Sequence, residues 1–151
     1  MHVWRLYPER FSETAFTGVG GLYVASRWNH LGTAMVYCAT SPALAALELF
    51  VNLEPNEVPD DLLMAAAEIP DDLVEQLNLD LLSSDWRDLN NLACRDLGSG
   101  WADSGRSVAL RVPSAVVDGD WNLLLNPKHK DFRRIKLIAP KPFRFDGRMF
   151  R

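Results

Sequence analysis

One carboxylate lies within an otherwise apolar stretch of this sequence. Residues 43–51 read ALAALELFV, in which Glu48 is the only polar residue. A helix that is apolar on every side is buried on most faces, so a carboxylate on it loses solvation unless another group pairs with it. Arg5 and Arg27 are available as partners. The pattern therefore indicates an inward-facing acid that lines a cleft.

Two other interpretations of Glu48 remain open from the residues alone. Glu48 and Asn52 are spaced to share a narrow polar edge of the helix, where both would meet water. Alternatively, Glu48 and Arg27 form a buried structural ion pair in a binding module without catalysis. A structural pair tolerates no single replacement without loss of folding, whereas a catalytic Glu48 can be altered with stability kept.

Length, composition and net charge indicate which class of protein this is. The chain has 151 residues, enough for one domain with a substantial core, and its 48% hydrophobic and 24% charged residues are typical of soluble globular proteins. A formal charge of −4 argues against a nucleic-acid binder that works through bulk electrostatics. The basic run KHKDFRRIK at 128–136 is the exception, and a solvated surface turn and strand edge is favoured over a phosphate-backbone site.

The cysteine count and the distribution of apolar residues indicate the cellular compartment. Cys38 and Cys94 are the only cysteines, which makes no disulfide framework and favours a reducing compartment. The stretch MHVWRLYPERF at 1–11 lacks the apolar core of a secretory signal, and no run approaches membrane-spanning length. We expect a cytoplasmic protein that does not contact a membrane.

The elements that position these side chains predict an α+β protein. Ser41 followed by Pro42 is typical of a helix N-terminus, because serine caps and proline fits the first turn. Further helices are expected at 71–82 and 85–97. Strands without regular helical crossovers indicate a single domain, 1–151, with a mixed or antiparallel sheet core and flanking helices. The expected strands are 3–6, 22–26, 33–39, 62–69, 108–112, 121–125, 135–138 and 143–145.

Standard catalytic motifs are missing from the sequence. It has no P-loop, no GxGxxG at a strand–helix junction, no HExxH, no CxxC pair and no GxSxG elbow. His2, His30 and His129 lack metal-ligand spacing, so no metal site is expected. Ser114 follows a strand without an evident His and Asp constellation, which favours a hydrogen-bonding role over a nucleophilic one.

An ordered set of short motifs resembles the RES domain family. Each motif alone is common, but together they cover nearly the whole chain in the family's order. The family's usual Gly-Gly-Arg-Trp-Asn appears here as ASRWN at 25–29, without the two glycines. The motifs are WRL at 4–6, RWNHLG at 27–32, VYCATSPALAALE at 36–48, GW at 100–101, LRVPSAVV at 110–117, WNLLLNPKH at 121–129 and PFRFDGR at 142–148.

The resemblance implies both a fold and a function. The fold would be ADP-ribosyltransferase-like, and the protein would be the toxin of a bacterial type II toxin–antitoxin pair, neutralised by an Xre-like helix-turn-helix antitoxin. It would act on NAD as a substrate, without a separate cofactor, and cleave the nicotinamide–ribose bond by hydrolysis or by phosphorolysis with phosphate as second substrate. The alternative is an ADP-ribosyltransferase that modifies a protein target. Nucleic acid would be contacted only through the antitoxin.

The resemblance also implies roles for particular residues. Arg5 and Arg27 would bind the pyrophosphate, and Glu48 would stabilise positive charge on the ribose or hold a ribose hydroxyl. Tyr37 would offer an aromatic face to nicotinamide, and Ser114 a hydrogen bond to its amide or to the ribose. The implied catalytic residues are Glu48, Arg27 and Tyr37, and the implied substrate-binding residues are Arg5, Arg27, Tyr37, Ser114 and Asn126.

Overall fold

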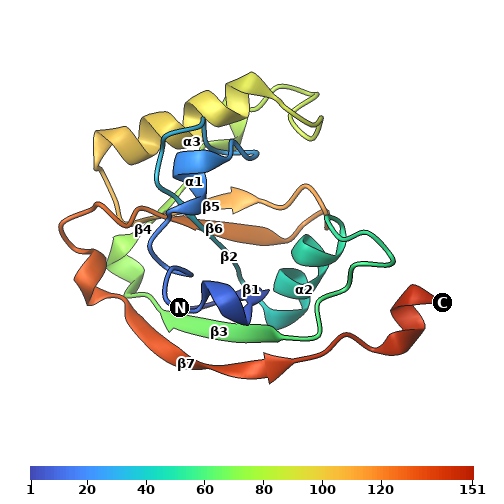
Figure 1. The fold of residues 1–151 in the computed structure, drawn as a ribbon. Helices are drawn as coiled ribbons and strands as arrows, with labels where there is room; N and C mark the ends of the chain where they lie inside the picture. Colours follow the sequence, from blue (N-terminus) through green and yellow to red (C-terminus); the bar gives the residue numbers. More distant parts are fainter.

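A seven-stranded mixed sheet forms the centre of the computed structural model, which describes all residues 1–151 (Figure 1). The strand order is β4-β5-β6-β2-β1-β3-β7, and every neighbouring pair is antiparallel except the parallel pair β4–β5. The strands are β1 (His2–Pro8), β2 (Val36–Ala39), β3 (Leu62–Glu68), β4 (Val74–Gln76), β5 (Ala109–Pro113), β6 (Trp121–Leu125) and β7 (Lys136–Phe143).

Three helices flank the sheet. They are α1 (Gly20–Tyr23), α2 (Pro42–Phe50) and α3 (Leu92–Ser104), and the chain also contains five short 3-10 turns. In Figure 1, α3 lies over β5 and β6, and α2 lies beside β1 and β2 on the other side of the sheet's centre. The Ser41 hydroxyl caps α2 by accepting a hydrogen bond from the backbone N–H of Leu44 at 3.0 Å, as the sequence predicts. None of the helices has the length and apolar character needed to span a bilayer.

The sheet opens between β1 and β2. These strands pair at one position only, Trp4 opposite Ala39, whereas β1 pairs with β3 along its whole length. One apolar cluster, which includes Val3 and Leu123, packs between the two halves of the sheet. A second cluster fills the space under α3, and a third holds α2 against β1 and β2. The core therefore supports both sides of the opening.

The expected fold class is confirmed in outline, with a mixed sheet and flanking helices. The strand predicted at 121–125 matches β6, and those at 62–69 and 108–112 match β3 and β5 within one residue at each end. Two strands predicted at 135–138 and 143–145 are in fact one, because β7 runs through its prolines. β7 is an edge strand, where a residue without an N–H is tolerated.

Three other predictions are wrong. The strand predicted at 22–26 overlaps the short helix α1, where a Cβ on Gly21 would lie 2.1 Å from the carbonyl oxygen of Thr33. The helix predicted at 71–82 is replaced by two 3-10 turns and β4, which pairs with β5. The helix predicted at 85–97 begins later, at Leu92, and continues through Gly98. Glycine is required at position 98 because the carbonyl of Trp28 packs against it where a side chain would lie.

Candidate active site

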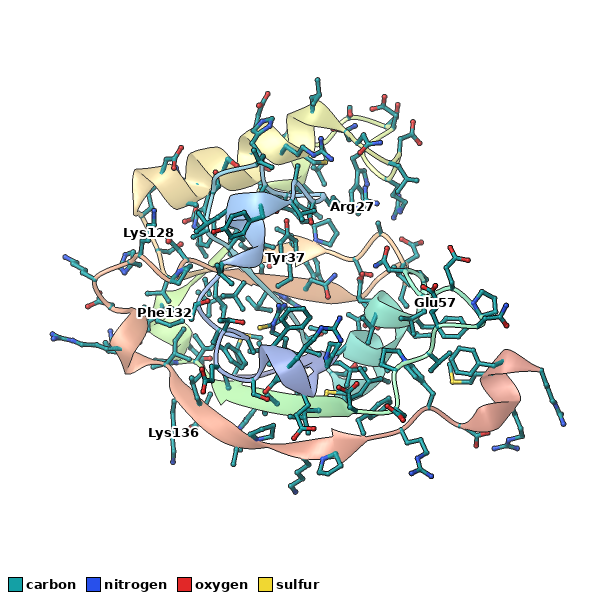
Figure 2. The ribbon with its side chains drawn as sticks, in the orientation of Figure 1. Arg27, Tyr37, Glu57, Lys128, Phe132 and Lys136 are labelled. Carbon is teal, nitrogen blue, oxygen red and sulfur yellow. The ribbon has the colours of Figure 1, made fainter.

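A cleft of about 720 Å³ lies at the opening between β1 and β2, within the usual range of small-molecule sites. Its walls come from those two strands, from α2, from β6, from the start of α3, and from the segments that precede β2 and α3 and that follow β5. Figure 2 shows Arg27 and Tyr37 below α3, with Lys128 and Lys136 farther to the left in the view. Polar residues in the wall are Arg5, Ser26, Arg27, Tyr37, Glu48, Asn52, Asn90, Arg95 and Asn122.

Glu48 projects from α2 into this cleft and is half-buried. One carboxylate oxygen, Oε1, accepts hydrogen bonds from the Ser114 hydroxyl at 2.8 Å and from the Asn122 amide at 2.6 Å. The other oxygen, Oε2, accepts none from the protein. No arginine lies within ion-pair distance of Glu48. The pairing with Arg5 or Arg27 that the sequence suggests is therefore wrong, and so is a structural Glu48–Arg27 pair.

Arg5 bridges the gap between the two strands. Its Nη1 donates to the backbone carbonyl of Tyr37 at 2.8 Å, at a place where β1 and β2 no longer pair. Its Nε is buried without a partner, and no carboxylate lies within ion-pair distance. Burial lowers the pKa of Arg5, while Cys38 and Tyr7 act in the opposite direction. A half-buried cation without a counterion favours binding of an anion in the cleft.

Arg27 lies on the opposite wall, in a turn that Tyr37 holds in place. The Tyr37 hydroxyl donates to Asn29 Oδ1 at 2.6 Å and accepts from the backbone N–H of Trp28 at 3.1 Å. Burial is the main cause that raises the pKa of Tyr37, so this hydroxyl stays protonated and can donate. Arg27 Nη1 donates to the carbonyls of Trp86 at 3.0 Å and Asp88 at 3.3 Å. Tyr37 thus orients the turn as well as lining the cleft.

Three cleft residues had no role in the sequence-based prediction. Arg95, on α3, donates through Nε to the carbonyl of Ser26 and through Nη2 to Asn90 Oδ1, both at 2.9 Å. Asn90 has a φ of 62°, a left-handed conformation that asparagine tolerates better than most residues. Asn122 lies within one of the motifs that carry the RES resemblance, which is the signal that could have identified it. Nothing local in the sequence singles out Arg95.

Two predicted site residues have different positions. Ser114 is buried and reaches Glu48, and its Oγ also accepts from the backbone N–H groups of Val116 and Val117, both at 3.1 Å. Asn126, in contrast, lies outside the cleft at the far end of β6 and borders a smaller cavity of about 450 Å³. Its amide donates to the Ala102 carbonyl and accepts from the backbone N–H of Lys128. The structure does not bring Asn126 to the other site residues.

The electrostatics of the cleft differ from those of the whole chain. The chain carries a formal charge of −4, whereas the cleft wall contains three arginines, Arg5, Arg27 and Arg95, and one carboxylate, Glu48. A cleft with this surplus of cations attracts anionic ligands, and guanidinium groups suit phosphate oxygens in particular. The arrangement can therefore hold a phosphate-containing molecule next to a single fixed carboxylate.

Comparisons with known proteins agree with the motifs. The RES domain family model matches residues 2–146. Toxin Res of Photorhabdus laumondii subsp. laumondii is 34% identical over 151 residues, covering 99% of this chain and 97% of the relative. The Prs ADP-ribosylating toxin of Sphingobium sp. is 33% identical over 154 residues, covering 98% of this chain and 96% of the relative.

A solved structure shares the fold. The crystal structure of the M. tuberculosis MbcT–MbcA toxin–antitoxin complex matches with a TM-score of 0.75 and 16% identity, covering 94% of this chain and 83% of that chain. At this identity the likeness shows the fold alone, which is α+β and ADP-ribosyltransferase-like. Family model, relatives and motifs agree over almost the full length of the sequence. The chain therefore belongs to the RES domain family.

Proposed function

We propose that this protein cleaves the nicotinamide–ribose bond of NAD, by hydrolysis or phosphorolysis, and that it is the toxin of a bacterial toxin–antitoxin pair. The cleft offers what such a substrate needs. NAD carries two phosphate groups, and cleavage creates positive charge on the ribose carbon that loses nicotinamide. Arginines and one fixed carboxylate meet these two requirements within a single cleft.

One observation carries the proposal. Arg5 is a half-buried cation with a buried, unpartnered Nε and no carboxylate within ion-pair distance, yet it lines the same cleft as the half-buried Glu48. In a structural ion pair these two charges would neutralise each other. Here they stay apart, so each is available to an opposite charge on the ligand. A pyrophosphate supplies the anion for Arg5, and the developing cation on the ribose supplies the partner for Glu48.

The chemistry requires little beyond placement and charge. The bond between ribose C1′ and the nicotinamide nitrogen breaks, and its electron pair stays on nitrogen, which was positively charged and becomes neutral. The ribose is left with oxocarbenium character, and the Glu48 carboxylate stabilises that charge more in the transition state than in the ground state. Water, which releases a proton to solvent, or phosphate then forms the new bond to C1′. Since nicotinamide leaves as a neutral molecule, no residue has to protonate it.

The biological role rests on the relatives. Toxin Res of Photorhabdus laumondii and the M. tuberculosis MbcT–MbcA complex are both named as toxins, and the latter was solved with its antitoxin. We infer that this chain also has an antitoxin partner, of the Xre-like helix-turn-helix class. Its induced expression should stop growth and lower cellular NAD, and a cognate antitoxin should reverse both effects. Growth arrest with unchanged NAD would contradict the proposed activity.

A second candidate function is ADP-ribosyl transfer to a protein. The observation that favours it is the 33% identity to a relative named Prs ADP-ribosylating toxin. Transfer would use the same cleft and the same bond cleavage, with a protein side chain in place of water or phosphate. The two functions therefore differ only in the acceptor.

The deciding experiment follows nicotinamide and the ADP-ribose moiety separately. Purified protein is mixed with NAD, with and without inorganic phosphate, and both products are measured by chromatography and mass spectrometry. Hydrolysis gives free ADP-ribose in both conditions, and phosphorolysis gives a phosphorylated ADP-ribose only with phosphate. Transfer labels a protein when cell extract and NAD labelled in the adenylate phosphate are added. No nicotinamide release in any condition, from folded protein free of antitoxin, would contradict both candidates.

A further inference from the structure

Two hydrogen-bond donors converge on one oxygen of Glu48. Asn122 Nδ2 lies 2.6 Å and Ser114 Oγ 2.8 Å from Oε1, and no protein donor reaches Oε2. An ionised carboxylate only accepts hydrogen bonds, so the Asn122 amide must present its NH₂ group to Glu48. The orientation of this amide is therefore fixed by chemistry.

The direction of the Ser114 hydroxyl is fixed as well. Its oxygen accepts the backbone N–H groups of Val116 and Val117, which leaves its own hydrogen to point at Glu48. Both donors also stand on rigid supports. Ser114 directly follows β5, and Asn122 lies in β6, paired with Ala39 of β2 on one side and Val112 of β5 on the other. A carboxylate whose one oxygen is held by two donors on rigid elements has little freedom to rotate.

The carbonyl oxygen of the Asn122 side chain gains no hydrogen bond from the protein. This atom, Oδ1, is buried and has no hydrogen-bond partner. A buried, unpartnered acceptor is destabilising, and such atoms are rare in folded proteins. An apolar side chain here would avoid the problem. The one hydrogen bond that the Asn122 side chain makes within the protein is that of its NH₂ group to Glu48.

We propose that Asn122 is a positioning residue that, together with Ser114, fixes the rotation of the Glu48 carboxylate so that Oε2 alone meets the ribose of the bound dinucleotide. The identity of that ligand rests on the proposed function, whereas the fixed carboxylate does not. A freely rotating carboxylate would present its charge to the ribose only part of the time. Two donors on Oε1 remove this freedom before the substrate arrives.

The test uses Asn122→Ala and Asn122→Asp, with Thr40→Ala as the matched control. Thr40 Oγ1 donates to the carbonyl of Trp121 at 2.9 Å, so the control removes one side-chain hydrogen bond to the residue next to Asn122 without touching Glu48. We expect kcat for nicotinamide release to fall about 10–100-fold in both Asn122 variants, with KM for NAD within about threefold of wild type. Thr40→Ala should retain kcat.

Asn122→Asp separates positioning from simple space filling. Aspartate has nearly the same shape but brings no NH₂ group and adds a like charge beside Glu48. Full activity of Asn122→Asp would overturn the proposal. Asn122→Ala should also melt no lower than wild type, because it removes the unpartnered Oδ1. A large loss of thermal stability together with unchanged kcat would make Asn122 a structural residue and would likewise overturn the proposal.

A crystallographic comparison keeps this test independent of the proposed function. In the unliganded Asn122→Ala protein, and equally in Asn122→Asp, we expect the Glu48 carboxylate to leave its single orientation and occupy more than one. An unchanged single orientation would refute the positioning role. If wild-type protein releases no nicotinamide from NAD, the proposed function fails, and these structures alone decide whether Asn122 fixes Glu48.

Discussion

Replacing Glu48 with glutamine removes one negative charge and keeps the shape of the side chain. The glutamine amide oxygen can still accept the hydrogen bonds from Ser114 and Asn122, which in wild type go to Oε1 at 2.8 and 2.6 Å. α2 and its serine cap are unaffected. We therefore expect the melting temperature of Glu48→Gln to stay within about 2 °C of wild type.

The effect on catalysis follows from the charge. A carboxylate about 4 Å from a developing unit charge contributes about 4 kcal/mol at an effective dielectric constant of about 20. This corresponds to about a thousandfold in rate, and solvent reduces it because Glu48 is only half-buried. We expect kcat for nicotinamide release to fall about 10²–10³-fold, with KM for NAD within about threefold.

The assay measures initial rates of nicotinamide release by chromatography over a range of NAD concentrations. Binding of ADP-ribose by calorimetry serves as the control for an intact cleft. If Glu48→Gln retained more than about a tenth of wild-type kcat, charge stabilisation by Glu48 would be refuted. If the same variant lost ADP-ribose binding instead, Glu48 would contribute to ligand binding and not to the transition state.

Three further predictions test other parts of the structure. Arg27→Ala should weaken ADP-ribose binding about 10–100-fold, because a charge-assisted hydrogen bond is lost. Arg27→Lys should not restore binding, because an ammonium cannot reproduce the guanidinium fork. An unchanged Kd for Arg27→Ala, measured by calorimetry, would exclude a phosphate contact. Ser41→Ala removes the hydroxyl that accepts a hydrogen bond from the backbone N–H of Leu44 and should lower the melting temperature by about 2–4 °C, whereas Ser41→Asp should not. Equal melting temperatures of wild type and both variants, measured by calorimetry, would show that the cap contributes nothing to stability. Burial raises the pKa of Cys38 to about 12, so thiol reagents at pH 8 should leave this cysteine unlabelled until the protein is unfolded. Rapid labelling of Cys38 in the folded protein would contradict this environment. Because the folded-state pKa lies above the ordinary value of 9.0, the contribution of the neutral thiol to stability is complete below about pH 9 and is lost as the pH rises toward 12.

Much of the site is predictable from sequence because its signals are local. A serine–proline pair sets the start of α2, and the apolar run that follows carries one carboxylate, so Glu48 is conspicuous without any structure. The ordered motifs add Arg5, Arg27, Tyr37 and Ser114. The structure brings the first three to one cleft with Glu48, and Ser114 reaches that carboxylate by a hydrogen bond.

The errors arise where tertiary contacts override local pattern. The spacing of Leu73 and Leu77 fits a helix, and both side chains are buried. The segment is nevertheless a 3-10 turn followed by the short strand β4, which pairs with β5. Gly98 looks like the exit of a helix, but it lies inside α3 because no side chain fits against the carbonyl of Trp28. Neither fact is visible from neighbouring residues. The partner strand and the packed turn lie 30 residues or more away.

Partners within the site are equally hard to predict. Arginines suggest themselves as partners of Glu48 by charge alone, but its partners are the hydroxyl of Ser114 and the amide of Asn122. Asn126 shares a motif with Asn122 and yet lies at the other end of β6. The four residue steps from one to the other span about 13 Å along a strand. A motif thus identifies a strand without deciding which of its ends meets the substrate.

The most direct test of the central claim is a crystal structure of Glu48→Gln with NAD, because this variant should bind the substrate without turning it over. We expect the pyrophosphate at Arg5 and Arg27 and the nicotinamide ribose next to residue 48, in the cleft between β1 and β2. NAD bound in the smaller cavity beside Lys128, or in the cleft with its nicotinamide ribose remote from residue 48, would contradict the assignment of this cleft as the site of cleavage.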